Sequence, residues 1–313
     1  MLNRRHIRVK VMQSIYAVHQ HKSDDINREE KFLFYSIEAI QELYLLLFSA
    51  MIELRSNEEK HLALSSKKHL ATTEELNPNT KFVQNQVLLL LESQSSLSVA
   101  FENKKINQWK LNDDLIIQLL DEIKKSDVYL EYMDAGAATF KDDAQFVYDL
   151  FEKVIAPNDR LYDYLEDYKL TWIDDYALVN TFIIKQLAKL KDVNSTVEIP
   201  RVYKDEDDKD FAKQLFIKTL LNEQELAKEY VNKTPNWDSE RIAEIDTIIL
   251  KMAICEILKF PSIPVKVTIN EYLEIAKEYS TPKSSIFING ILDNLIKEFK
   301  EENKLNKSGR GLM

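Results

Sequence analysis

Residues 245–299, IDTIILKMAICEILKFPSIPVKVTINEYLEIAKEYSTPKSSIFINGILDNLIKEF, carry the pattern that decides the fold class. Apolar residues recur in the first block at i, i+3, i+4 and i+7, which is the stripe of a helix that faces a core. These residues are Ile245, Ile248, Ile249 and Met252. Pro261 and Pro264 predict the end of that helix, because proline lacks an amide hydrogen and disfavours helical geometry in the residue before it.

Two further helices are predicted after the prolines. Thr268 and Glu271 have the spacing of a capping box, which predicts a helix start. The apolar stripe of that helix is Leu273, Ala276 and Tyr279. Thr281 and Pro282 predict the N-cap and first position of the next helix. Its apolar face comprises Phe287, Ile291, Leu295 and Phe299.

Gly290 departs from its surroundings, because a glycine inside a helix costs about 1 kcal/mol relative to alanine. The favoured interpretation is a close helix crossing, where the absence of a side chain admits another backbone. The alternative is a helix that breaks at Gly290, since Asn289-Gly290 is a typical turn sequence.

Composition favours an all-α protein of a reducing compartment. The chain has 313 residues, 45% of them apolar, with only 4 glycines and 7 prolines, so turn-forming residues are scarce. No apolar run approaches the roughly 18 residues of a membrane span, and the N-terminus does not resemble a signal peptide. The single Cys255 excludes an internal disulfide. We expect a cytoplasmic protein.

Positive charge is concentrated at the N-terminus of an otherwise acidic chain. The net charge is −10, which argues against a protein that coats nucleic acid indiscriminately. The cations before the first acidic residue, Asp24, are Arg4, Arg5, Arg8, Lys10 and Lys22. The pattern of residues 4–20 predicts an amphipathic helix that carries these arginines. The guanidinium group of arginine presents planar forks of hydrogen-bond donors that fit phosphate groups and base edges, so the sequence predicts one localised anion-binding site. The alternative is that these arginines lie on a solvated helix face.

Helical patterns continue over 29–55, 81–101, 113–133 and 140–156, while residues 56–80 are predicted as a loop or weak helix and 193–210 as a linker. We therefore divide the chain into an N-terminal helix, 1–24; a helical expansion, 25–205; a C-terminal helical subdomain, 206–300; and a flexible basic tail, 301–313. The alternative for this basic, glycine-containing tail is a secondary electrostatic contact with RNA.

An internal repeat is also predicted, in which residues 142–190 match 207–255 at a constant offset of 65. The matched residues include Asp143 with Asp208, Phe146 with Phe211, Leu161 with Leu226, Trp172 with Trp237, and Ile183 with Ile248. A shared amphipathic pattern is the alternative explanation.

Signatures of catalysis are scarce. All five histidines lie in the first quarter of the chain, far in sequence from the only cysteine, and no phosphate loop or nucleophile motif is present. We expect a binding protein, not an enzyme, with no metal and no cofactor.

Both ends of the chain resemble the NusB family of bacterial transcription antitermination factors. Arg5, Arg8, Gln13 and Tyr16 match the family's opening pattern. Residues 251–257 (KMAICEI), 267–277 (VTINEYLEIAK) and 287–293 (FINGILD) are similar to three of its later motifs. The resemblance covers about 1–20 and 208–298, and most NusB proteins are shorter, so 25–205 is an expansion.

This resemblance implies a NusB-like, all-α bundle of two subdomains, enlarged by additional helices. It implies binding of boxA-type single-stranded RNA with a small-subunit ribosomal protein, NusE, in the transcription elongation complex, to support ribosomal RNA operons. The implied RNA-binding residues are Arg4, Arg5, Arg8, Gln13, Lys283, Ser284 and Phe287. The implied partner-binding residues are Tyr16, Glu240 and Asp246. Phe287 is either an exposed stacking ring or a core residue, Lys283 stands where the family is often acidic, and homodimerisation is left open.

Two alternatives follow from the same sequence. The net charge and the long expansion suit a helical adaptor that binds proteins without selecting RNA. NusB-like domains also occur fused to an RNA cytosine methyltransferase, but four glycines and one cysteine are too few for that enzyme.

Overall fold

The computed structural model describes residues 1–231 and 243–312, and within these ranges it contains helices and no strand. The all-α class predicted from the sequence is confirmed. None of the helices in the described ranges is long and apolar enough to cross a membrane. The chain divides into two compact units, Met1–Ile37 with Val202–Met313, and Glu38–Arg201. The predicted segments 1–24 and 206–300 fall in the first unit, and most of 25–205 falls in the second.

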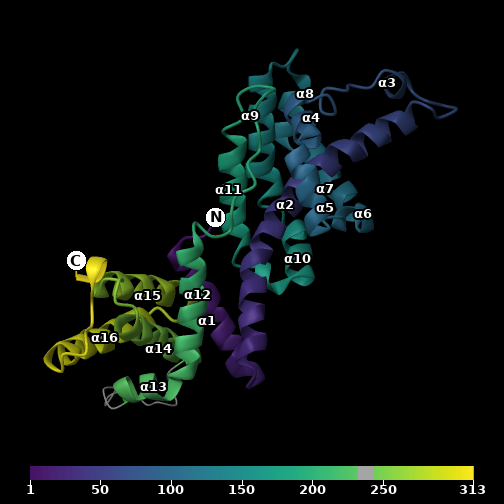
Figure 1. Cartoon of the computed structure of the whole chain (residues 1–313). Coiled ribbons are helices and arrows are strands. Elements are labelled where there is room, and N and C mark those ends of the chain that lie inside the picture. The colour runs from purple at the N-terminus through teal and green to yellow at the C-terminus, as the bar shows by residue number, and fades with distance from the viewer. Residues whose placement is uncertain (232–242, 313) are drawn as a thin grey trace. The chain divides into compact units, whose positions relative to one another are not determined.

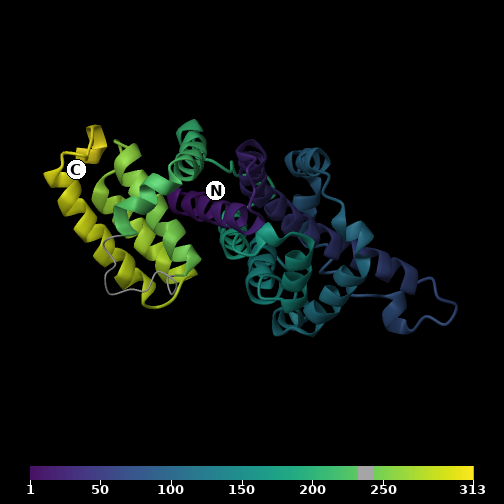
Figure 2. The same ribbon diagram turned by 90° about the horizontal axis from the view of Figure 1, so that it is seen from below.

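The first unit is built around one central helix, α14 (Glu244–Lys259). The other elements of this unit are α1 (Arg4–His21), the start of α2 (Ile26–Ser65), α12 (Glu206–Leu221), α13 (Glu223–Val231), α15 (Val265–Tyr279), α16 (Ser284–Glu301) and η4 (Gly309–Leu312). Helix α14 packs against α1, α12, α13, α15 and α16 (Figures 1 and 2). It is therefore buried on all sides, unlike a surface helix with one apolar stripe.

The apolar stripes predicted for α14 and α16 are largely confirmed. Ile248, Ile249 and Met252 are buried and Ile245 is half-buried. In α16 all four predicted core residues are buried: Phe287, Ile291, Leu295 and Phe299. The prolines end α14 as predicted.

The predicted capping box at Thr268 and Glu271 is wrong. Helix α15 starts three residues before Thr268, directly after Pro264, whose fixed backbone suits a helix start. Thr268 is fully buried and its hydroxyl donates a hydrogen bond to Glu256 Oε1 at 2.7 Å. Helix α16 begins at Ser284, with Thr281 and Pro282 in the preceding turn.

The second unit packs short helices against the remainder of α2. They are α3 (Thr73–Leu76), α4 (Gln86–Ser93), α5 (Ser95–Lys104), α6 (Gln108–Leu111), α7 (Asp113–Lys125), α8 (Asp127–Asp134), α9 (Phe140–Leu150), the π-helix η1 (Phe151–Ile155), α10 (Asp159–Tyr168), η2 (Leu170–Trp172) and α11 (Tyr176–Leu187). Two buried indoles, of Trp109 and Trp172, donate to carbonyls of α2 at Leu46 (2.9 Å) and Ala39 (2.8 Å). Each indole thereby buries its ring without leaving its N–H unsatisfied.

Several predicted helix boundaries differ from the structure. Helix α2 continues to Ser65, ten residues past the predicted end. The helices predicted over 81–101 and 113–133 are each divided, because Gln94 and Ser126 adopt extended backbone. The acidic run in the predicted linker is the first turn of α12, where carboxylates are favoured by the helix dipole.

The helix starts in the two predicted copies are separated by offsets close to 65 residues. Helices α12, α13 and α14 begin 66, 64 and 68 residues after α9, α10 and α11. The matched pairs Phe146 and Phe211, and Ile183 and Ile248, are buried in both copies. Trp237 lies outside the described residues. The helix order supports the duplication hypothesis, which stays a prediction.

The C-terminal tail differs from the flexible segment expected for 301–313. Through Leu312 it folds back on the turn between α14 and α15 and forms η4. The backbone amide of Ser308 donates to the carbonyl of Pro261 at 3.1 Å, and Lys307 Nζ donates to the carbonyl of Phe260 at 3.0 Å.

Neither interpretation of Gly290 is correct. Helix α16 runs through it unbroken, and a Cβ built on Gly290 would meet no atom within 4 Å. The residue is exposed, so no neighbouring backbone in this structure requires a glycine there.

We therefore expect Gly290→Ala to raise the free energy of unfolding by about 1 kcal/mol, because alanine has the higher helix propensity and meets no clash. Urea unfolding followed by circular dichroism measures the change. A loss of stability would show that Gly290 is needed for close packing after all.

Candidate nucleic-acid interface

Helix α1 presents arginines where a helix does not favour them. Its first turn contains no acidic residue, although the helix N-terminus carries a partial positive charge that disfavours cations. Asn3 caps the helix by accepting from the amides of Arg5 (2.9 Å) and His6 (3.1 Å). The charges of the arginines are balanced by acidic residues from three other helices of the same unit.

The innermost pair joins Arg8 to Glu256 of α14. Arg8 Nε and Nη2 donate to the two carboxylate oxygens at 2.8 and 2.7 Å, with the side chains 2% and 0% exposed. Thr268 and Tyr272 of α15 also donate hydroxyls to Glu256. Burial lowers the pKa of Arg8, but the hydrogen bonds and charge of Glu256 outweigh burial and raise it.

Arg4 and Arg5 lie nearer the surface. Arg5 donates two hydrogen bonds to Glu271 of α15, at 2.9 and 3.1 Å, and remains 40% exposed. Arg4 donates to Asp208 of α12 at 2.9 Å and remains 41% exposed. Both side chains therefore keep part of their guanidinium surface available to a ligand.

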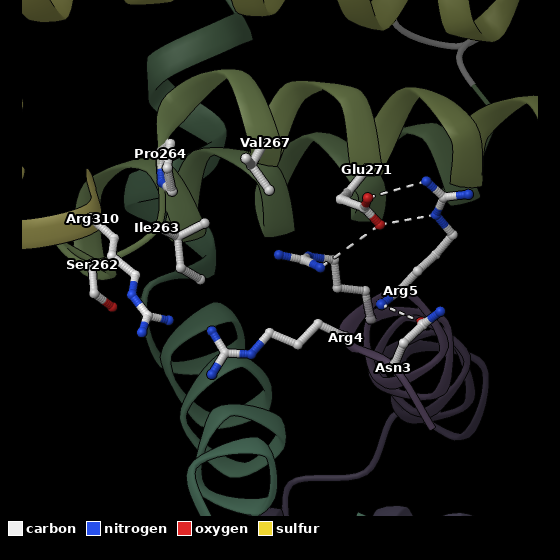
Figure 3. A pocket seen from close by; sticks show the side chains of 10 residues that line it. Asn3, Arg4, Arg5, Ser262, Ile263, Pro264, Val267, Glu271 and Arg310 are labelled. Atoms are coloured by element: carbon white, nitrogen blue, oxygen red, sulfur yellow. Dashed lines mark hydrogen bonds and ion pairs between the residues drawn. The ribbon is translucent and has the colours of Figure 1, made fainter. Parts of the chain in front are cut away.

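These arginines line a pocket of about 630 Å³. Its other lining residues are Asn3, Ser262, Ile263, Pro264, Val267, Glu271 and Arg310 (Figure 3). Four arginines thus surround a partly apolar surface. The volume lies within the usual range for sites of small ligands, about 300–1,000 Å³.

The start of α16 is less open than predicted. Lys283 is exposed, but Ser284 is 3% exposed and donates a hydrogen bond to Asp246 Oδ2 at 2.7 Å. Phe287 is 7% exposed, so its ring is in the core and does not form an exposed stacking platform. Gln13 is half-buried.

Of the predicted partner-binding residues, Tyr16 is 40% exposed. Asp246 is 5% exposed, so it is not the surface charge that we expected. Glu240 lies outside the described residues. The hydrogen bond from Ser284 to Asp246 joins a residue predicted to bind RNA to a residue predicted to bind the partner, at the first turn of α14.

A charged cluster beside Tyr16 was missed by the sequence analysis. His19 Nε2 lies 2.8 Å from Glu223, and its Nδ1 lies 3.3 Å from Glu244. Lys251 also pairs with Glu223. The contact with Glu223 raises the pKa of His19 despite partial burial, and the same contact lowers the pKa of Glu223 to about 2.

The acidic partners Asp208 and Glu271 were also missed, and the basic tail was considered for an RNA contact without a place in this pocket for Arg310. Glu271 lies in the family motif at residues 267–277, but the spacing of residues in that motif does not indicate an ion pair with an arginine of α1. In the described ranges no group of three or more histidine, cysteine or carboxylate side chains could hold a metal ion.

Residues 185–297 match the NusB family, and these residues include all three acids that hold the arginines of α1. The "Transcription antitermination protein NusB" of Salinibacter ruber is 47% identical over 116 residues, which cover 36% of this chain and 72% of that protein. The chain belongs to the NusB family.

Two further relatives with the same name come from Chloroherpeton thalassium and Dictyoglomus turgidum. The first is 44% identical over 105 residues, which cover 34% of this chain and 50% of that protein. The second is 45% identical over 84 residues, which cover 26% of this chain and 58% of that protein. No solved structure matches the chain. The NusB match leaves out most of the second unit.

We expect Arg8→Ala to destabilise the protein by about 3–5 kcal/mol, because it leaves the buried Glu256 carboxylate unpaired. The control is Arg5→Ala, which removes a partly exposed pair and is expected to cost about 0–1 kcal/mol. Urea unfolding compares the two variants. Equal losses would show that the buried pair does not hold α1 in place.

His19 is expected to make stability depend on pH. Because its folded pKa is raised, its contribution is present below about pH 6.5 and is lost as the pH rises through that raised pKa. The stability difference between the wild type and His19→Gln should be larger at about pH 5.5 than at about pH 8.5. Glu223 stays ionised at both values because its pKa is about 2. A pH-independent difference would refute this role of His19.

Proposed function

We propose that this protein is a transcription antitermination factor that binds boxA-type single-stranded RNA with a small-subunit ribosomal protein acting as NusE. It would support transcription of ribosomal RNA operons as a non-catalytic component of the elongation complex in the cytoplasm. The observation that carries the proposal is the arginine-lined pocket at the start of α1, assembled on acidic residues of the NusB region.

The charge pattern supports RNA as the ligand. A localised basic site on a protein of net charge −10 attracts a polyanion to one place and repels it elsewhere. Arg4 and Arg5 each pair with a carboxylate, and each side chain remains about 40% exposed. Each can therefore donate further hydrogen bonds to a phosphate or a base edge. Arg8 is buried, and we assign it the role of positioning α1.

The proposed RNA-binding residues occupy both ends of α14. The pocket includes Ser262 and Ile263, just after its last residue, while Ser284 bonds Asp246 in its first turn. A helix of 16 residues is about 24 Å long. We infer that the RNA spans several nucleotides between the pocket and the exposed Lys283.

The proposed partner surface lies at the Lys283 end. Exposed Tyr16 and the His19 cluster adjoin the first turn of α14, where the carboxylates Glu223 and Glu244 provide negative charge for a basic ribosomal protein. RNA and partner would then bind side by side, which accounts for their acting together.

The test is fluorescence anisotropy of a boxA-type RNA and a scrambled RNA, with and without the ribosomal protein, over a salt series. We expect selective binding that tightens with the partner and weakens with salt. Arg5→Gln and Lys283→Gln should each weaken binding about fivefold. Arg160→Gln, which removes another exposed, glutamate-paired arginine, is the matched control.

Binding of the ribosomal protein without RNA selectivity would support a helical protein-binding adaptor instead. That alternative draws on the net charge and on the second unit, most of which lies outside the NusB match.

A further inference from the structure

The C-terminal tail is fitted to the turn between α14 and α15 by two glycines. Gly309 has a φ of +56°, in the left-handed region that glycine adopts at no steric cost. A Cβ on Gly311 would lie 1.9 Å from the carbonyl oxygen of Pro261, so only glycine permits this approach. Two of the four glycines of the chain are therefore required in the last five residues, on either side of Arg310.

This docking places Arg310 in the arginine-lined pocket. Figure 3 shows Arg310, from the tail, and Arg4, from α1, pointing toward the same part of the pocket. Arg4, Arg5 and Arg8 each pair with a carboxylate. Within the described ranges no side chain pairs with Arg310, so its charge is the one that the pocket leaves unbalanced.

Asp208 balances the charge of Arg4, so Arg310 adds a positive charge to the pocket that no described side chain balances. An anion between the two guanidinium groups would balance that charge and would accept hydrogen bonds from both forks of donors. Ile263, Pro264 and Val267 supply an adjacent apolar surface on which a ribose or base can pack. Phosphate beside an apolar face is the chemistry of one nucleotide of a single strand.

We propose that Arg310 of the docked tail binds an RNA phosphate in this pocket together with Arg4. This inference rests on the proposed function, and it adds a residue that lies outside the NusB match at 185–297. The tail then completes the site by bringing a cation from the other end of the chain to the start of α1.

The test compares RNA affinity and its salt dependence in the wild type, Arg310→Gln and Lys300→Gln. Lys300 is an exposed cation just before the tail that does not line the pocket, so its variant controls for the loss of one charge. We expect Arg310→Gln to weaken binding about fivefold and to lower the salt slope by about 0.7, the value for one phosphate contact with a single strand. Lys300→Gln should match the wild type.

A second variant tests docking without removing the charge. Gly311→Ala displaces the tail from Pro261, so it should reproduce the loss seen in Arg310→Gln and add nothing in the double variant. Thermal unfolding by circular dichroism confirms that each variant keeps its fold. A wild type that does not bind RNA would overturn the proposed function and this inference together. A wild type that binds, with Arg310→Gln no weaker than Lys300→Gln, would overturn this inference alone.

Discussion

The buried ion pair between Arg8 and Glu256 is the constraint on which the candidate site depends. Its partners are 248 positions apart in the sequence, and neither charge can return to water without breaking the fold. Thr268 and Tyr272 satisfy the remaining capacity of Glu256, so α1, α14 and α15 are joined at one point. With α1 fixed there, Arg4 and Arg5 are placed at the pocket four and three residues away.

The helices of this fold could be predicted from the sequence because apolar periodicity reports burial directly. The stripes of α14 and α16 pointed to the correct core residues. The failures have a common physical origin, which is tertiary context. Thr268 looks like a cap locally, but α14 supplies a buried carboxylate for its hydroxyl. Gly290 looks like a contact point, yet the neighbouring surface is open.

The sequence indicated which residues belong to the candidate site but not which of them are exposed to a ligand. The family motifs pointed to Arg8, Ser284, Phe287 and Asp246, but all four side chains are buried in this structure. Arg310 belongs to no motif, and its placement in the pocket depends on how the tail folds back. The signal that could have found it is the clustering of glycines in a chain that otherwise lacks them.

The second unit contains a buried carboxylate at the place that the repeat assigns to Asp208, but its partners differ. Asp208 pairs with Arg4, whereas Asp143 accepts from the amide and side chain of Gln86 (2.8 and 3.1 Å) and from the Tyr132 hydroxyl (2.6 Å). Neutral donors replace the arginine as the partners of this carboxylate. If residues 142–190 and 207–255 arose by duplication, the later copy pairs this carboxylate with an arginine of α1, whereas the earlier copy pairs it with neutral donors.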